Sequence, residues 1–443
     1  TFMGSSSSNS WNILLGTTVT EPTQINTPGT SSIFITWEHS IVDIVTPFVG
    51  KALQVSFVRN SFEKVAAGAS NSTTTTLAIA SALDSMNINP NAEQTQLINA
   101  VSSATTATEF NDMLNKFVPN INAFSQSIKL QNTIFNKAET RIASLMDDRN
   151  QKYSAGYVAG DLSPNTAFWI GSFGNIAKQL SITNNPGYKS RSVGFLGGLD
   201  HKIDSESIVG VAAGASNSTV EEASNDNYHT RINSYHVLIY GGCLFEDNEF
   251  MQWSINGTTN KNRGSRIANI NGVDISGYSN YSSFQTGAKL NLGKNLDFGD
   301  LLRLTPVYSV AYSFSQQPRY TETGSIGALN VIPNRNNHIL TTGLGLKISS
   351  PSEECAWWLF GTSELRAMIE YDVVSSEQAT VSNFVIGSSD FTIINKPNRL
   401  AIKAGANFSF EMFRHLFLQF NYDYELRHRF FDHVGTAKIK YVF

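Results

Sequence analysis

The sequence predicts an all-β fold, a 12-stranded antiparallel transmembrane β-barrel, and three observations lead to this prediction. From Thr166 onward, apolar residues recur at every second position in about twelve segments, which is the period of strands with two different faces. Only 15% of the 443 residues are charged, whereas Phe (28), Tyr (15) and Gly (32) are abundant, a mixture that suits a large β structure with aromatic belts. Short turns alternate with long polar connections, as in outer-membrane barrels.

Composition also excludes several classes of function. A formal net charge of −4 argues against a nucleic-acid partner, because such a protein needs a basic patch. No apolar run of about 18 residues is present, so no transmembrane helix is encoded. The two cysteines, Cys243 and Cys355, have no CxxC motif or histidine at ligand spacing, and the strand order places them too far apart for a disulfide. We therefore expect no metal and no cofactor.

Residues 1–73 are predicted to be the end of an upstream β domain together with a flexible linker. Residues 1–30 are rich in Ser, Thr, Asn and Gly, and short β-like runs follow in residues 31–59. The chain starts at Thr1 without an export signal, so we expect an upstream part. In residues 74–124 the apolar spacing changes to three and four residues, which predicts a connector of short amphipathic helices broken near Pro90 and Pro119.

One longer helix is predicted over Ser125 to Asp148, within a segment 125–165 that leads into the barrel. At 1.5 Å per residue it would measure roughly 36 Å, enough to cross an apolar band about 25 Å tall. Its apolar positions are few, and Lys129, Lys137 and Arg141 surround them. From the local sequence alone, an exposed linker helix is the more common interpretation.

The barrel is predicted to occupy residues 166–443. Its candidate strands are Phe168–Gly174, Val193–Leu199, Val209–Ala213, Tyr235–Ile239, Met251–Ile255, Phe284–Leu292, Leu302–Tyr312, Leu344–Ile348, Leu365–Tyr371, Leu400–Phe408, Leu416–Tyr424 and Gly435–Phe443. Twelve is an even number, as bacterial single-chain barrels have. Long polar loops are expected at 217–229, 257–277, 315–338 and 374–397. Pro306 is an irregularity, because it removes one hydrogen bond from a strand.

Charged residues in these segments lie on the parity that the apolar residues leave free. They are Lys289, Arg303, Glu364, Arg366, Glu370, Arg399, Lys403, Asp423, Glu425, Lys438 and Lys440. A barrel lumen and the wet face of a soluble sandwich both predict this alternation. The sorted loop lengths favour the barrel, since a sandwich has no reason to separate long from short connections.

Four motifs, taken in order, carry a resemblance to a known family. They are the Gly- and Ala-rich strands Val193–Asp200 and Gly210–Gly214, then Leu304-Thr305-Pro306 leading to Tyr320-Thr321-Glu322, and the terminal Lys440-Tyr441-Val442-Phe443. With this order and spacing, residues from about Asp147 to Phe443 resemble the translocator β-domain of autotransporters, the type V secretion family. That family tolerates a proline at the place of Pro306.

The connector adds a narrower resemblance. Leu77–Asp84 is similar to the region before the barrel in surface-antigen autotransporters of rickettsial type. Phe117-Val118-Pro119-Asn120 departs from the Leu-Ser-Pro-Glu that is usual there, which puts the subfamily in doubt.

The resemblance implies that an α-helix threads the pore, and Ser125 to Asp148 has the right place in the chain. Its cations, Lys129, Lys137 and Arg141, would then pair with inward carboxylates such as Glu364, Glu370 or Asp423. The lumen-facing set also contains Arg366, Lys438 and Lys440. Some relatives cut themselves at an Asn-Asn bond in this helix. The helix here has none, and the nearby pair Asn184-Asn185 lies in a predicted loop, so we expect no cleavage by that route.

The family further implies that Phe443, Tyr441 and Ile439 form the signal read by the barrel-assembly machinery. The expected function is export of an N-terminal passenger through the bacterial outer membrane and its display on the cell surface. Outer-membrane lipid and the passenger are the other expected partners of a monomer, with a host-cell receptor bound through an adhesin-like passenger. No zinc-protease, phosphate-loop or nucleophile-elbow motif is present, so we expect no enzyme. A small-solute channel and a soluble all-β binding module remain alternatives.

Overall fold

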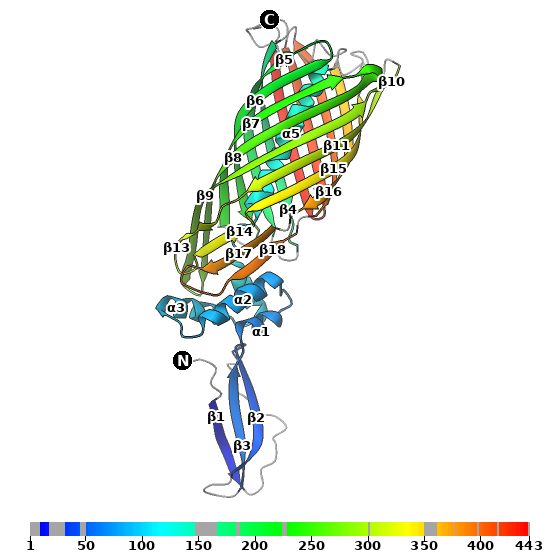
Figure 1. Cartoon of the computed structure of the whole chain (residues 1–443). Coiled ribbons are helices and arrows are strands. Elements are labelled where there is room, and N and C mark those ends of the chain that lie inside the picture. Colours follow the sequence, from blue (N-terminus) through cyan, green and yellow to red (C-terminus); the bar gives the residue numbers. More distant parts are fainter. Residues whose placement is uncertain are drawn as a thin grey trace.

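The computed structural model describes residues 9–16, 32–44, 50–146, 166–182, 187–223, 228–299, 302–349, 361–376, 378–396, 398–413 and 416–441. Three parts follow one another along the molecule: a small N-terminal sheet, a helical unit, and a barrel with a helix inside it (Figure 1). No helix in these ranges is both long enough and apolar enough to span a membrane.

Twelve long strands form the barrel, as predicted. They are β4 (Thr166–Gln179), β5 (Tyr188–Lys202), β6 (Ser207–Glu222), β7 (Tyr228–Leu244), β8 (Glu249–Ile270), β9 (Val273–Lys294), β11 (Leu302–Gln316), β15 (Asn336–Ser349), β16 (Gly361–Ser375), β19 (Leu400–Phe413), β20 (Leu416–Arg427) and β21 (Phe430–Tyr441). Each pairs antiparallel with the next, and β21 pairs with β4 in the register Gly435 to Gly174. The sheet is therefore closed and has no free edge.

The two faces of the barrel wall differ in polarity, as β5 illustrates. Val193 is 66% exposed and Phe195 53% exposed on the outside, whereas Ser192, which directly precedes Val193, is 2% exposed on the inside. Buried serine, threonine, asparagine and glutamine side chains continue this pattern along β6 to β9. An apolar exterior around a polar interior is the arrangement that a barrel in lipid requires.

The prediction of a long loop at 257–277 is wrong. Strands β8 and β9 continue through this stretch and meet at Asn271-Gly272, whose φ angles are 48° and 81°. Positive φ at both central residues is the mark of the tight turn that Asn-Gly favours in hairpins. The polar residues that suggested a loop are strand residues, because the hairpin extends past the apolar belt. The loop predicted at 217–229 is likewise shorter, since β6 ends at Glu222 and β7 starts at Tyr228.

We call the end of the barrel with the β8–β9 turn the outer end, and the end with the turns at 203–206 and 246–248 the inner end. At the outer end the connections 317–335 and 376–399 are folded. They contribute a four-stranded sheet, called the outer sheet, in the order β12 (Tyr320–Thr321), β14 (Leu329–Pro333), β17 (Gln378–Phe384) and β18 (Phe391–Asn395). The short β13 (Thr323–Gly324) pairs with β9.

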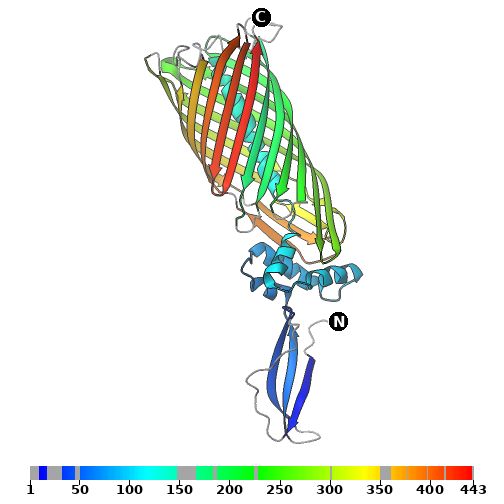
Figure 2. The same ribbon diagram turned by 180° about the vertical axis from the view of Figure 1, so that it is seen from behind.

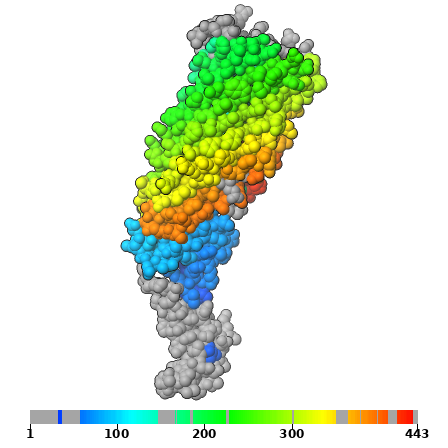
Figure 3. Space-filling model, viewed as in Figure 1, coloured from blue at the N-terminus to red at the C-terminus, as the bar shows by residue number. Residues whose placement is uncertain are grey.

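The helical unit consists of four short helices and packs on the outer sheet. They are α1 (Phe62–Ala67), α2 (Thr74–Met86), α3 (Ala92–Val101) and α4 (Ala107–Asn115), and Pro90 and Pro119 lie in the breaks, as predicted. Helix α1 was not predicted, because six residues give too little periodicity. One hydrophobic core joins the unit to the outer sheet, with Phe117 and Phe384 at 5.2 Å between ring centroids. Figure 3 shows the two parts in direct contact.

Two smaller features complete the fold. The N-terminal sheet has the order β1 (Asn9–Gly16), β3 (Gly50–Arg59), β2 (Ile35–Ile44), so β1 forms where a flexible stretch was expected. Pro306 sits where the partner of β11 changes: β9 pairs up to Val307, and the short β10 (Leu296–Phe298) pairs from Leu304. The proline therefore falls in an interruption of the ladder, where its missing N–H costs nothing.

Candidate functional site: the barrel lumen and its helix

Helix α5 (Asn122–Met146) runs through the barrel and lies within the ring of strands in both views (Figure 2). Its 25 residues correspond to about 37 Å at 1.5 Å per residue. The helix starts three residues before the predicted Ser125, while Asp147 and Asp148 lie outside the described residues. Asn120 caps its N-terminus, since the side-chain Oδ1 accepts hydrogen bonds from the N–H groups of Asn122 (3.0 Å) and Ala123 (3.1 Å).

One apolar stripe holds α5 against one side of the lumen. Leu130, Ile134, Ala138, Ile142 and Leu145 recur every three or four residues and form a single face. This face packs on inward-facing residues of β4 to β7, namely Trp169, Phe173, Leu196, Ile208, Ala212, Leu238 and Tyr240. The helix is therefore seated on one wall of the barrel.

Two glycines in the wall allow the close approach of the helix. A Cβ atom on Gly242 would lie 2.7 Å from both Ile142 Cγ2 and Met146 Sδ, and one on Gly287 would lie 2.5 Å from Gln131 Nε2. Atoms of neighbouring side chains do not approach a real Cβ so closely. A larger residue at either position would therefore force the helix side chains or the wall to shift.

The inner half of α5 is anchored by Arg141. Its guanidinium forms an ion pair with Asp200 of β5, in which Nε donates to Oδ2 at 2.7 Å, and both side chains are at most 4% exposed. Tyr240 also donates to Asp200, and the Trp169 Nε1–H donates to the Tyr240 hydroxyl at 2.7 Å. The carboxylate thus has three donors, which compensates for its removal from water.

The outer half is held by Lys129 and by neutral side chains. Lys129 pairs with Glu425 of β20 and lies 4.4 Å from the ring centroid of Phe430. Gln126 donates to Ser192 Oγ at 2.7 Å and accepts from Ser190 Oγ at 2.6 Å. Each buried polar group named here has a partner, so the helix and the wall are chemically matched.

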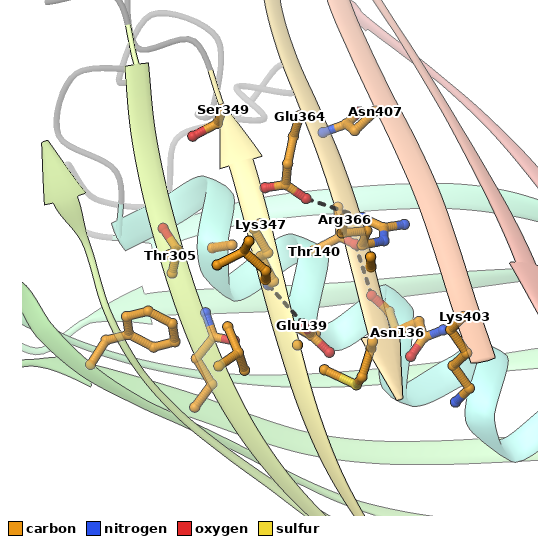
Figure 4. A pocket seen from close by; sticks show the side chains of 18 of the residues that line it. Asn136, Glu139, Thr140, Thr305, Lys347, Ser349, Glu364, Arg366, Lys403 and Asn407 are labelled. Carbon is orange, nitrogen blue, oxygen red and sulfur yellow. Dashed lines mark hydrogen bonds and ion pairs between the residues drawn. The ribbon is translucent and has the colours of Figure 1, made fainter. Parts of the chain in front are cut away.

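Glu139 faces the opposite side of the lumen. Its carboxylate accepts from Lys289 of β9 at 3.0 Å and from Lys347 of β15 at 2.8 Å (Figure 4). Lys289 also lies 3.4 Å from Asn136 Oδ1. A single helix carboxylate therefore bridges two lysines of the facing strands.

The predicted partners of the helix cations require correction. Lys129 and Arg141 pair with Glu425 and Asp200, and Lys137 donates to the carbonyl oxygen of Ser172 at 3.0 Å. The carboxylates expected to receive them pair instead within the barrel wall: Glu364 and Asp423 with Arg366, and Glu370 with Lys403 at 2.6 Å. For Arg141 the reason is position, since the apolar stripe of α5 packs on β4 to β7, where Asp200 is nearer. Lys129 still reaches β20, but it pairs with Glu425, two residues beyond the predicted Asp423.

The lumen residues that sequence reasoning missed include Gln126, Glu139, Asp200 and Glu222, and also Lys347, which donates to Glu139. Glu222 accepts from Asn122 Nδ2 at 2.7 Å. Asp200 follows Leu199 on the inward parity of β5, so the alternation that identified other charges could have found it.

Several predicted residues lie at or beyond the limits of the described chain. Lys438, Ile439, Lys440 and Tyr441 belong to β21, and Phe443 lies outside the described residues, as do Cys355 and the pair Asn184-Asn185. Cys243 is a free thiol. In the described ranges no group of three or more His, Cys, Asp or Glu side chains is placed to hold a metal ion.

Comparison with known proteins gives consistent results. Residues 168–423 match the model of the autotransporter β-domain family. The chain is 24% identical over 298 residues to outer membrane protein B of Rickettsia japonica, covering 65% of this chain and 18% of that protein. It is 23% identical over 322 residues to the putative surface cell antigen sca1 of Rickettsia conorii, covering 70% of this chain and 17% of that protein. The chain thus spans less than a fifth of these relatives.

Among solved structures, the translocator domain of the autotransporter NalP from Neisseria meningitidis superposes with a TM-score of 0.51. The superposition covers 71% of this chain and 98% of that chain at 16% sequence identity. This likeness shows the same fold, a 12-stranded barrel with an N-terminal helical segment. Because the family model matches more than half of the chain and twelve strands close around a buried helix, the chain belongs to the autotransporter β-domain family.

Proposed function

We propose that this chain moves an N-terminal passenger through its own lumen and displays it on the bacterial surface. The domain is an outer-membrane translocator, and we propose that its cargo is a passenger on the same chain. In the proposed division, residues 1–73 are the end of the passenger and residues 74–124 connect the passenger to the pore helix. Residues 125–165 thread the pore and lead into the barrel, and residues 166–443 form the barrel that spans the membrane. Helix α1 extends the connecting helical unit back to Phe62.

One observation carries the proposal: α5 joins opposite ends of the barrel. Its first residue, Asn122, contacts Glu222 at the outer end, and its last, Met146, lies beside Gly242 at the inner end. Strand β4 then starts at the inner end, because Thr166 pairs with His201 next to the turn at 203–206. The chain therefore passes through the lumen before it forms the barrel, which is the path of an exported segment.

Conductance in planar bilayers tests whether α5 fills the pore. Deleting residues 120–148 should raise single-channel conductance strongly, because the lumen then holds no helix. Replacing exposed Lys261, which lies on the long β8 strand, with Gln is a matched control that should change nothing. An unchanged conductance after the deletion would favour the small-solute channel, whose lumen is open from the start.

The proposal also covers the passenger and its partners. We propose an adhesin-like passenger that binds a host-cell receptor, because one relative is described as a surface cell antigen. Further partners in the proposal are outer-membrane lipid and the barrel-assembly machinery, which would read Phe443, Tyr441 and Ile439, and the barrel would act as a monomer. Protease added to intact cells should remove residues 1–73 if they are displayed, and their protection would contradict display.

A further inference from the structure

The lumen is not filled evenly, because the apolar stripe of α5 packs on β4 to β7 and the helix also approaches β8 and β9. On the other side of the helix two cavities remain. The inner cavity has a volume of about 180 Å³, with Glu139, Thr140, Lys347 and Arg366 among its lining residues (Figure 4). The outer cavity has a volume of about 810 Å³, and Asn132, Lys396 and Arg429 line part of it.

The two cavities adjoin at one level of the barrel. Both are lined by Asn136 of α5, Lys289 of β9, Glu370 of β16 and Lys403 of β19, which we call the waist. Lys403 and Glu370 form an ion pair of 2.6 Å between two strands of the wall. The two cavities share these four lining residues, and side-chain ion pairs rearrange far more readily than the backbone.

The charge along this space has one sign in excess. Six cationic side chains line the outer cavity against two carboxylates, the former being Lys129, Lys289, Lys396, Lys403, Arg427 and Arg429 and the latter Glu370 and Asp372. Glu425 and Asp432 lie close to Lys129, and Glu139 pairs with Lys289, so six cations face five carboxylates when these three are added. The inner cavity is nearly balanced, with five cations and four carboxylates.

We propose that the space beside α5 is a path for small inorganic anions that stays available while the helix occupies the lumen. A polar lumen lined with lysine and arginine attracts anions, and low-dielectric walls focus that field. The waist limits the path to ions of about the size of chloride, because its ion pairs leave no room for a peptide. This second activity is separate from passenger export, which needs the whole lumen.

The full chain in planar bilayers under a KCl gradient tests the path. We expect a small, steady conductance with a reversal potential that shows preference for chloride. Lys396→Gln combined with Arg429→Gln should shift the reversal potential toward the value expected for a pore that does not discriminate between chloride and potassium. The matched control is Arg191→Gln, which removes a cation from the exposed side of β5 and should leave the reversal potential unchanged.

A second variant tests the waist. Lys403→Ala with Glu370→Ala removes both members of the ion pair and should raise the small conductance severalfold, with the same ion preference. Exit of the helix would appear instead as the large steps of the variant that lacks residues 120–148. A silent full chain, a preference for potassium, or a waist variant without effect would overturn the anion path, while a conductance rise on helix deletion would still support export.

Discussion

At the scale of single residues, the ion pair of Arg141 with Asp200 is the firmest tie between the helix and the barrel. Asp200 is buried, so loss of its cation leaves a charge in a poorly solvated place. Removing one partner of such a pair typically costs about 3–5 kcal/mol, more than the pair itself contributes. The asymmetry allows a clean experiment.

Arg141→Leu should therefore lower the resistance of the barrel to heat and denaturant. In semi-native gels, the temperature at which the folded band converts to the unfolded band should fall. Adding Asp200→Asn should restore part of the loss, because the unpaired charge is gone. Equal stability of all three proteins would contradict a role of this pair in holding the helix.

Phe443 is the second residue whose role can be tested. In the proposed function it is part of the signal for the barrel-assembly machinery, at the end of a strand whose Ile439 and Tyr441 share its parity. Phe443→Ser should reduce the amount of barrel in the outer membrane while synthesis continues. Immunoblots of membrane fractions measure this, and Val442→Ser, on the other parity, is the control. Normal assembly of the Phe443 variant would contradict the proposed role of Phe443 as an assembly signal.

At the scale of elements, the fit of α5 depends on the missing side chain at Gly242. Gly242→Val should push the inner end of the helix away from β7, since the new Cβ would overlap Ile142 and Met146. We expect a higher conductance and a lower heat-modification temperature. Gly257 is a matched strand glycine with nothing within 4 Å of its Cβ position, so Gly257→Val should behave as wild type. Identical behaviour of both variants would show that the helix tolerates the overlap.

The elements also show how far the sequence could predict the structure. All twelve barrel strands follow from period-2 alternation, because a strand between lipid and a polar lumen must alternate. The same rule failed at 257–277, where the outward face of the β8–β9 hairpin carries exposed polar residues such as Lys261 and Arg263, so the alternation is lost although Ile270 and Ile275 are buried against the helical unit. There Asn271-Gly272 was the available signal.

For the lumen, the sequence could predict that inward charges form ion pairs but could not predict which residues pair. Inward charges at Glu364, Glu370 and Asp423 were found by parity, but their partners depend on which wall the helix occupies. That choice is set by the apolar stripe of α5 and by glycines such as Gly242, and both involve packing in three dimensions. Parity predicts whether a side chain points into the lumen or out of the barrel, but it does not predict the distance between two side chains.

At the scale of the whole molecule, Arg266 links parts of the chain that are far apart in sequence. It is 0% exposed, forms an ion pair with Glu322, and donates to the carbonyl oxygens of Lys116 at 3.0 Å and Gly327 at 2.8 Å. The hairpin, the connection 317–335 and the helical unit therefore meet at one guanidinium.

Arg266→Gln should loosen the helical unit from the outer end and leave the barrel closed. Limited proteolysis should cut within residues 62–121 faster than in wild type, because the shared core opens more often. The barrel band should remain heat-modifiable. Lys294→Gln serves as control, since its ion pair with Glu249 is exposed and contributes little. Unchanged proteolysis would show that the hydrophobic core alone holds the unit.

The core shared by the helical unit and the outer sheet also bears on protein engineering. A cargo protein joined directly before the pore helix, at Asn122, would replace residues 62–121. That junction would expose Leu329, Val331, Phe384 and Ile393 to solvent and leave an aggregation-prone apolar rim around the exit. A fusion point before Phe62 keeps these residues covered and joins the cargo to a folded helical unit.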